Sequence, residues 1–190
     1  MTNRFVSFLS GGLLLFALAF FVAACDSTEP DDDGAGEEEI ISNVTITLTN
    51  PTDNSTVTAE AVFDEAGVKQ SAETLTLNAG TSYTGTIDLR NRFEGESITE
   101  EIEEEAGEHQ FFYDVQGDLD GGVMVTITDT DENGLPVGLE FEVVVAEDLS
   151  GSGELRVVLG HYDERPKEAN ETISAIPETD IDFTYPLAVQ

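Results

Sequence analysis

The chain has 190 residues, of which 40 are Asp or Glu and only seven are Lys or Arg, so its formal charge at pH 7 is −33. This excess of negative charge argues against nucleic acid and anionic lipid surfaces as partners, because both carry the same sign. A single cysteine excludes a disulfide framework within the chain. The length is sufficient for one domain with a core of its own.

The first 24 residues have the layout of a secretory signal peptide. Arg4 precedes a dense apolar stretch, and this stretch, Leu13 to Ala24, has 12 residues. A membrane-spanning helix needs about 20. The closing residues, Val22-Ala23-Ala24-Cys25, resemble the lipobox of bacterial lipoproteins, which implies cleavage before Cys25 and acylation of its thiol. We therefore expect residues 1–24 to be removed and Cys25 to hold the mature chain in a membrane.

Residues 25–39 are predicted to be the lipidated cysteine followed by a flexible acidic tether. Between Asp26 and Glu39 the only apolar side chain besides proline is Ala35, so the segment cannot bury enough surface to order itself. The expected location is the cell envelope, with the lipid in the outer membrane and the domain on the periplasmic face or at the cell surface.

Removal of residues 1–24 leaves 166 residues with a formal charge of −34. Self-repulsion on this scale opposes a compact state, so we expect the domain to fold where counterions screen it. We interpret the charge as a halophilic adaptation, and a cation-binding surface is the alternative interpretation.

From Ile40 onward the dominant hydrophobic period is two, which is typical of half-buried strands. Nine segments alternate in this way: 44–48, 57–63, 75–77, 83–89, 111–115, 123–127, 139–145, 155–159 and 181–189. Turn residues separate them, including Asn133-Gly134 and Gly151-Ser152-Gly153. Residues 40–190 are therefore predicted to form an all-β domain, an antiparallel immunoglobulin-like β-sandwich of about seven to nine strands. Pro186, inside the last segment, indicates an edge or a bulge there.

One segment departs from this period. Ser97-Ile98-Thr99-Glu100 has the pattern of a capping box, and Ile98, Ile102 and Ala106 share one helical face. The pattern predicts one short helix over 98–106 at an end of the sandwich. His109 follows it and is interpreted as an anchor of the helix-to-strand corner, since the spacing to the other histidine, His161, does not suggest a shared site. Residues 161–179 are predicted to form a long polar loop.

The sharpest ligand motif runs from Asp129 to Gly134 and includes Glu140. Asp129, Asp131, Asn133 and Glu140 match the spacing of oxygen ligands in an EF-hand loop, so they are provisional Ca²⁺ ligands, and Ca²⁺ is the only cofactor that the sequence suggests. Strands rather than helices flank the motif, which favours a hairpin that turns at Asn133-Gly134. The hairpin and the calcium site are compatible with each other.

The block Ile98-Thr99-Glu100-Glu101-Ile102-Glu103-Glu104-Glu105, continued by Glu108-His109-Gln110-Phe111-Phe112, resembles the hallmark of a group of small uncharacterised acidic lipoproteins from Gram-negative bacteria. The resemblance implies no known activity. Members are sometimes assigned to the type 1 periplasmic-binding fold, in which strands and helices alternate over two lobes. The period of two in this chain predicts a β-sandwich instead.

The sequence lacks a nucleophile motif, a phosphate-binding loop and a Cys/His zinc motif, so we expect no catalytic residues and no enzyme. The leading hypothesis is a lipid-anchored, non-enzymatic binding, adhesion or structural module of the cell envelope. Its expected partners are the membrane, through the lipid on Cys25, and an unknown envelope protein or glycan, with no nucleic acid. The alternatives are a calcium-binding module and a hydrolase, the latter only if glutamates near His109 line a cleft.

Overall fold

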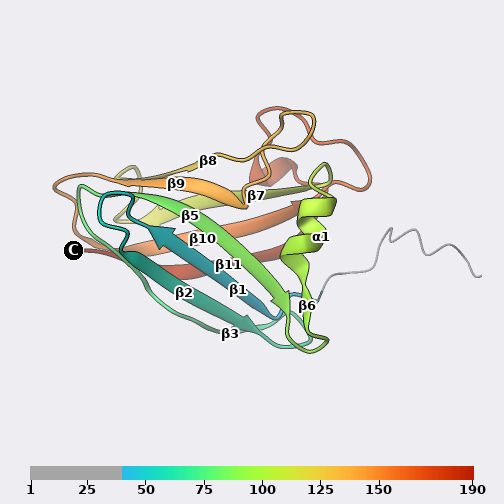
Figure 1. Cartoon of the computed structure of the whole chain (residues 1–190), viewed down its shortest axis with the longest axis horizontal. Coiled ribbons are helices and arrows are strands. Elements are labelled where there is room, and N and C mark those ends of the chain that lie inside the picture. The colour runs from blue at the N-terminus through green and yellow to red at the C-terminus, as the bar shows by residue number, and fades with distance from the viewer. Residues whose placement is uncertain (1–39) are drawn as a thin grey trace, which may run out of the picture. The chain divides into compact units, whose positions relative to one another are not determined.

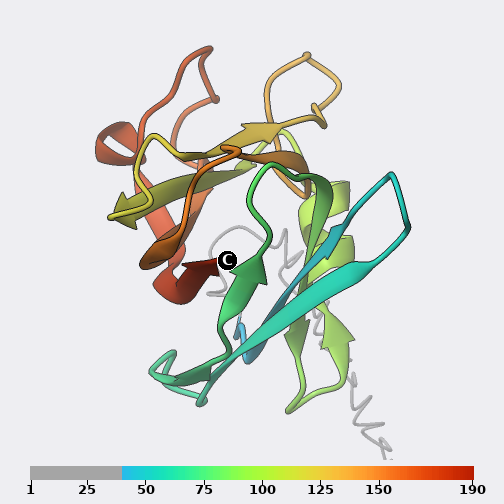
Figure 2. The same cartoon turned by 90° about the vertical axis from the view of Figure 1, so that its left-hand side faces the viewer.

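The computed structural model describes residues 40–190, which form two packed β-sheets and one short α-helix (Figures 1 and 2). The larger sheet has seven strands in the order β3-β2-β1-β5-β9-β8, and β6 pairs with β5. Its strands are β1 (Asn43–Thr49), β2 (Thr56–Phe63), β3 (Lys69–Ala72), β5 (Ser82–Asn91), β6 (Glu96–Ser97), β8 (Val123–Ile127) and β9 (Glu140–Val145). The predicted all-β sandwich with one short helix is confirmed.

The smaller sheet has four strands in the order β4-β11-β10-β7. They are β4 (Leu75–Leu77), β7 (His109–Gly117), β10 (Gly151–His161) and β11 (Glu178–Val189). All nine predicted strands are present, and β3 and β6, which are short and polar, bring the number to eleven. The predicted turn at Gly151-Ser152-Gly153 is wrong: these residues begin β10, and the chain turns at 146–150 instead.

The core lies between the sheets and consists of the odd-numbered apolar side chains of most strands. Phe63, Phe141, Val157 and Phe183 are buried, whereas Ile127 is only half-buried. Each fully buried aliphatic or aromatic side chain contributes roughly 1.5 to 3 kcal/mol. Tyr185 also connects the two sheets, since its hydroxyl donates a hydrogen bond of 2.7 Å to the carbonyl of Val44.

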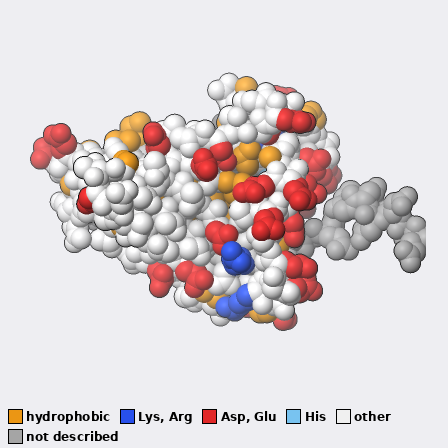
Figure 3. Space-filling model, in the orientation of Figure 1, with side chains coloured by type: hydrophobic (Ala, Val, Ile, Leu, Met, Phe, Trp, Pro, Cys, Tyr) orange, Lys and Arg blue, Asp and Glu red, His pale blue; other side chains and the backbone are white. Residues whose placement is uncertain are grey.

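The outer face of the larger sheet is rich in threonine. Pairing in register sets Thr47 beside Thr58 on one side and beside Thr86 on the other, and Thr49 lies between Thr56 and Thr84. Figure 3 shows few charged side chains over β1, β2 and β5, while Asp and Glu gather around α1. The β-branched threonines favour extended strands and hold this face polar without adding to the charge.

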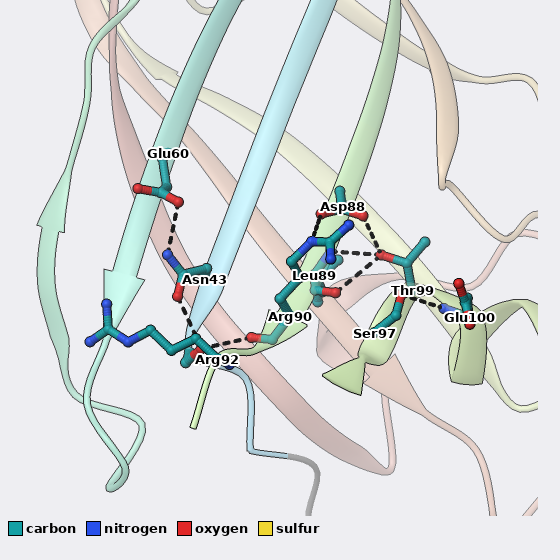
Figure 4. A network of polar contacts seen from close by, with 10 residues as sticks. Asn43, Glu60, Asp88, Leu89, Arg90, Arg92, Ser97, Thr99 and Glu100 are labelled. Atoms are coloured by element: carbon teal, nitrogen blue, oxygen red, sulfur yellow. Dashed lines mark hydrogen bonds and ion pairs between the residues drawn. The ribbon is translucent and has the colours of Figure 1, made fainter. Parts of the chain in front are cut away.

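The helix α1 spans Ile98–Glu104 and lies against the end of β5. Ser97 is the N-cap, as predicted, and its Oγ accepts a hydrogen bond from the Glu100 amide. Ile98 and Ile102 are buried on the inner face. Thr99 ties the first turn to β5, because its Oγ1 accepts a hydrogen bond of 2.7 Å from the Leu89 amide (Figure 4). The helix ends two residues before the predicted Ala106, which is half-buried.

Pro186 lies in an inner strand and not at an edge or a bulge as the sequence predicted, but it falls just beyond the end of the β4 pairing. In β11 it pairs with Glu154 of β10, but β4 covers the opposite side only from Leu187 to Val189, in the one parallel pairing among the described strands. Proline has no N–H to donate, and at this position β4 does not require one.

Candidate functional site

Three connections meet at the α1 end of the sandwich: the corner between α1 and β7, the loop from β8 to β9, and the loop from β10 to β11 (Figure 1). His109 is the first residue of β7 and His161 is the last residue of β10, and the two are paired in register. The expectation that they do not share a site is wrong. Because β7 and β10 are antiparallel, the start of one strand necessarily meets the end of the other.

The two imidazole rings stack, with their centroids 4.5 Å apart and their planes at 21°. The His109 side chain is fully buried, and that of His161 is 17% exposed. The Nδ1 of His109 lies 3.2 Å from the carbonyl oxygen of Glu105, so this histidine anchors the corner after α1, as its sequence position predicted. A carbonyl can only accept a hydrogen bond, and Nδ1 is therefore the protonated nitrogen.

Asp180 completes this group, and a β-bulge places it there. Leu159 pairs with Ile181, whereas the next residue of β10, Gly160, pairs with Thr179, so Asp180 is the extra residue of the bulge. Its Oδ2 lies 3.8 Å from His109 Nε2 and its Oδ1 lies 3.5 Å from His161 Nδ1. Bulges redirect side chains in this way. We call His109, His161 and Asp180 the histidine–aspartate cluster.

Burial determines the protonation of His109 and Asp180. Burial lowers the pKa of His109 to about 4. The hydrogen bond to the Glu105 carbonyl raises this pKa, whereas the electrostatic effects of His161 and Lys167 lower it. Burial raises the pKa of Asp180 to about 6, with His161 opposing the shift and Glu178 adding to it. At neutral pH the imidazole of His109 is therefore neutral and Asp180 is largely ionised.

Lys167, from the loop between β10 and β11, reaches into the same corner. Its Nζ donates hydrogen bonds to the carbonyl oxygens of Ala106 (2.7 Å), His109 (2.9 Å) and Pro136 (3.0 Å). It also forms an ion pair of 3.0 Å with Asp131 Oδ2, and both side chains are buried. One ammonium group thus joins all three connections.

The predicted calcium ligands are divided between the loop interior and the surface. Asp129 accepts hydrogen bonds from the amides of Gly138 and Leu139, and Asp131 accepts from those of Asn133 and Leu135. Burial tends to raise the pKa of Asp131, but these amides and Lys167 outweigh it and lower the pKa. Asn133 and Glu140 are exposed.

The hairpin interpretation of this motif is confirmed. β8 and β9 pair, and the amide of Gly134 closes a turn on the carbonyl of Asp131. Within residues 40–190, the acidic and histidine side chains that converge as a possible metal-binding group are those of the histidine–aspartate cluster and not the carboxylates of this loop. Calcium binding at Asp129, Asp131, Asn133 and Glu140 stays a prediction.

A hollow of about 500 Å³ lies beside α1, lined by glutamates and by Arg90, Gly95 and Ser97. The glutamates are Glu96, Glu100, Glu101 and Glu104. Burial raises the pKa of Glu101, and its acidic neighbours add to this shift. His109 does not line this hollow, and the hydrolase alternative stays a prediction.

A larger cavity, of about 730 Å³, lies along the side of β11 that β4 leaves uncovered, and we call it the β11 groove. Phe63, Ile181 and Phe183 contribute its apolar lining. Four carboxylates, those of Glu65, Glu178, Asp180 and Asp182, and one lysine, Lys69, also line it. The Nζ of Lys69 donates a hydrogen bond of 2.9 Å to the carbonyl of Thr184, which blocks part of the strand edge.

Sequence reasoning identified His109 but missed its partners. His161 and Lys167 come from the stretch predicted as a polar loop, and Asp180 follows it directly. They meet through strand pairing, a bulge and a loop conformation that no short motif encodes. The available signal was compositional: the chain has only two histidines, and each lies at a predicted strand boundary.

Cys25, the predicted signal peptide and the acidic tether lie outside the described residues. Among the helices of residues 40–190, none has the length and hydropathy of a membrane-spanning segment. Comparison with known protein families, with curated proteins and with solved structures finds no match. The resemblance to acidic lipoproteins therefore stays a prediction.

Proposed function

We propose that this chain is a lipid-anchored, non-enzymatic protein of the cell envelope, and that its sandwich binds an extended basic segment of a partner protein in the β11 groove. The observation that carries the proposal is the uncovered edge of β11 beside this groove. An extended peptide adds to such an edge by main-chain hydrogen bonds, and neighbouring pockets select its side chains.

The lining of the groove indicates the chemistry of the partner. Alternate side chains of an added strand point in opposite directions, so one set would contact Phe63, Ile181 and Phe183. The other set would face a rim with four carboxylates and one lysine. This rim favours lysine or arginine in the partner, and the charge of the whole domain would speed the encounter.

A synthetic peptide tests the groove directly. A blocked peptide of alternating lysine and valine is titrated against the full-length chain in mild detergent, and binding is followed by fluorescence anisotropy. We expect binding by this peptide, and no binding by the matching glutamate–valine peptide or by a lysine–valine peptide with N-methylated backbone amides. Equal binding of the N-methylated peptide would overturn strand addition, since it lacks the amide donors.

Two charge reversals separate the groove from general attraction. Glu65→Lys changes the rim of the groove, and Glu103→Lys makes the same change on the exposed face of α1. We expect Glu65→Lys to weaken the binding of the lysine–valine peptide severalfold and Glu103→Lys to leave it nearly unchanged. Equal effects would indicate attraction to the acidic surface as a whole and would contradict the proposal.

The anchor has its own test. In a bacterial host fed an alkyne-labelled fatty acid, we expect the wild-type chain to incorporate the label and to fractionate with membranes. Cys25→Ser should lose both properties. Incorporation of the label by Cys25→Ser would place the lipid elsewhere.

A further inference from the structure

The histidine–aspartate cluster holds three potential metal ligands in one place. The ligand atoms of His109, His161 and Asp180 all lie within 4.8 Å of one another. Two of the separations are 3.8 Å (His109 Nε2 to Asp180 Oδ2) and 3.5 Å (His161 Nδ1 to Asp180 Oδ1). Ligand atoms at about 2.0–2.2 Å around a tetrahedral zinc ion lie roughly 3.4 Å apart, which is close to these two separations. The stacked rings would tilt to direct both nitrogen lone pairs at one ion.

The orientation of His109 suits a metal ligand. Its Nδ1 hydrogen-bonds the Glu105 carbonyl, which leaves the lone pair on Nε2, the atom that faces Asp180 Oδ2. In metal-binding histidines the N–H of the second ring nitrogen commonly donates a hydrogen bond to a backbone carbonyl in this way. A lone pair and a carboxylate oxygen repel each other, and a cation between them converts this repulsion into attraction.

Hydrogen bonding within the cluster leaves one oxygen of Asp180 unsatisfied. The separations of 3.5 and 3.8 Å are longer than ordinary N–H···O hydrogen bonds. The side chain of Asp180 is only 10% exposed, and its Oδ2 is buried and accepts no hydrogen bond from the described residues. A buried carboxylate oxygen in this state is destabilising unless a cation satisfies it.

We infer that His109, His161 and Asp180 bind one divalent transition-metal ion, with zinc as the best-suited common ion. Two imidazole nitrogens and one carboxylate favour zinc and its first-row neighbours over Ca²⁺ and Mg²⁺, which prefer oxygen ligands. Asp180 also lines the β11 groove, and this gives the ion a path from solvent. The inference goes beyond the proposed function and is independent of it, because ion binding requires no peptide.

Calorimetry on the full-length chain tests the site. The protein is stripped with a chelator and titrated with Zn²⁺ in buffer containing excess Mg²⁺, which occupies the acidic surface. We expect one Zn²⁺ per chain. His161→Ala and Asp180→Asn should each weaken the Kd by about tenfold or more, whereas Glu178→Gln, a matched carboxyl change in the same strand, should alter it by less than about twofold.

A spectroscopic readout on the wild-type chain covers the case in which a variant fails to fold. The chain has two histidines, so a ¹⁵N imidazole spectrum contains only their signals. We expect Zn²⁺ to shift His109 Nε2 and His161 Nδ1, and Ca²⁺ to shift neither. Absence of stoichiometric Zn²⁺ binding, or binding that leaves both imidazoles unshifted, would overturn the inference. So would binding that disappears in Cys25→Ser, which would assign the ion to a thiol.

Discussion

Lys167 Nζ lies 3.0 Å from Asp131 Oδ2, and neither side chain is more than 1% exposed. The ammonium group also bonds to three backbone carbonyls, so it serves as the cation for a corner built from three separate connections. Removal of such a buried charge leaves its partners without compensation, and this is far more costly than the loss of an exposed ion pair.

Lys167→Met is therefore expected to lower the free energy of unfolding by about 3 to 5 kcal/mol, since it leaves Asp131 ionised and unpaired in the interior. Urea denaturation measures the change. Lys69→Met makes the same substitution at an exposed lysine and should cost less than about 1 kcal/mol. If both variants lost equal stability, Lys167 would not be the link between the connections.

The histidine–aspartate cluster predicts an unusual pH dependence in the metal-free protein. His109 has a pKa of about 4 when folded and 6.5 as its ordinary value, so between these values only the unfolded chain takes up the proton, and stability falls as the pH falls. Asp180 has a pKa of about 6 when folded and 3.8 ordinarily, so there the folded chain holds the proton, and stability falls as the pH rises. The two contributions nearly cancel between pH 4 and 6.

Asp180→Asn removes one of these contributions. From pH 4 to 6 the stability of this variant should rise by about 2 kcal/mol relative to that of the wild type, because the opposing contribution of Asp180 is gone. Chemical denaturation across this range, with a chelator present, checks the difference. Glu164→Gln, an exposed carboxyl in the same connection, should follow the wild-type curve. Parallel curves for Asp180→Asn and the wild type would contradict the assignment of opposite proton uptake.

The charge of the domain predicts a steep response to salt. Residues 40–190 contain 32 acidic residues against six Lys and Arg. Three of the arginines already form ion pairs, Arg90 with Asp88, Arg156 with Asp182 and Arg165 with Glu171. Screening weakens these few attractions, each worth at most about 1 kcal/mol, but it relieves many more repulsions. The melting temperature should therefore rise continuously from about 0.1 M to 2 M NaCl. A melting temperature that does not change with salt would contradict the conclusion that repulsion between carboxylates limits stability.

The core has no room for a side chain at Gly85. It pairs in register with Phe141, and a Cβ at this position would overlap the phenylalanine ring. Gly85→Ala should cost about 1 to 3 kcal/mol because the ring must move against Tyr113. Phe141→Leu in the Gly85→Ala background should recover part of the loss. Gly107→Ala, where a Cβ meets nothing within 4 Å, is the control and should change stability by less than about 0.5 kcal/mol.

The alternation of apolar residues was sufficient to predict the sandwich, because half-buried strands expose every second side chain. Phe63, Phe141 and Phe183 all point inward as this period requires. The strands β3 and β6 escaped prediction because they carry no apolar alternation and depend on their neighbours for pairing. The first residues of β10, Gly151 to Gly153, have the composition of a turn, but β11 and β7 pair with them as a strand.

The histidine–aspartate cluster could not be predicted from the sequence for a different reason. His109 and His161 are 52 residues apart, and only the register between β7 and β10 sets their rings in contact. Asp180 joins them through one extra residue in β11. A site of this kind depends on pairing between distant segments, whereas a loop motif such as Asp129 to Gly134 is visible because its residues are neighbours in the chain.

The central position of β11 has a consequence for the order of folding. The smaller sheet cannot close until β11 inserts between β4 and β10, and this strand follows both of them in the sequence. Gln190 itself is fixed by two backbone hydrogen bonds, to Leu77 and from Ala79. Pairings over such sequence distances form slowly. Until residues 178–189 are available to pair, the smaller sheet therefore lacks the strand that joins β4 to β10, and we expect the sandwich to stay open.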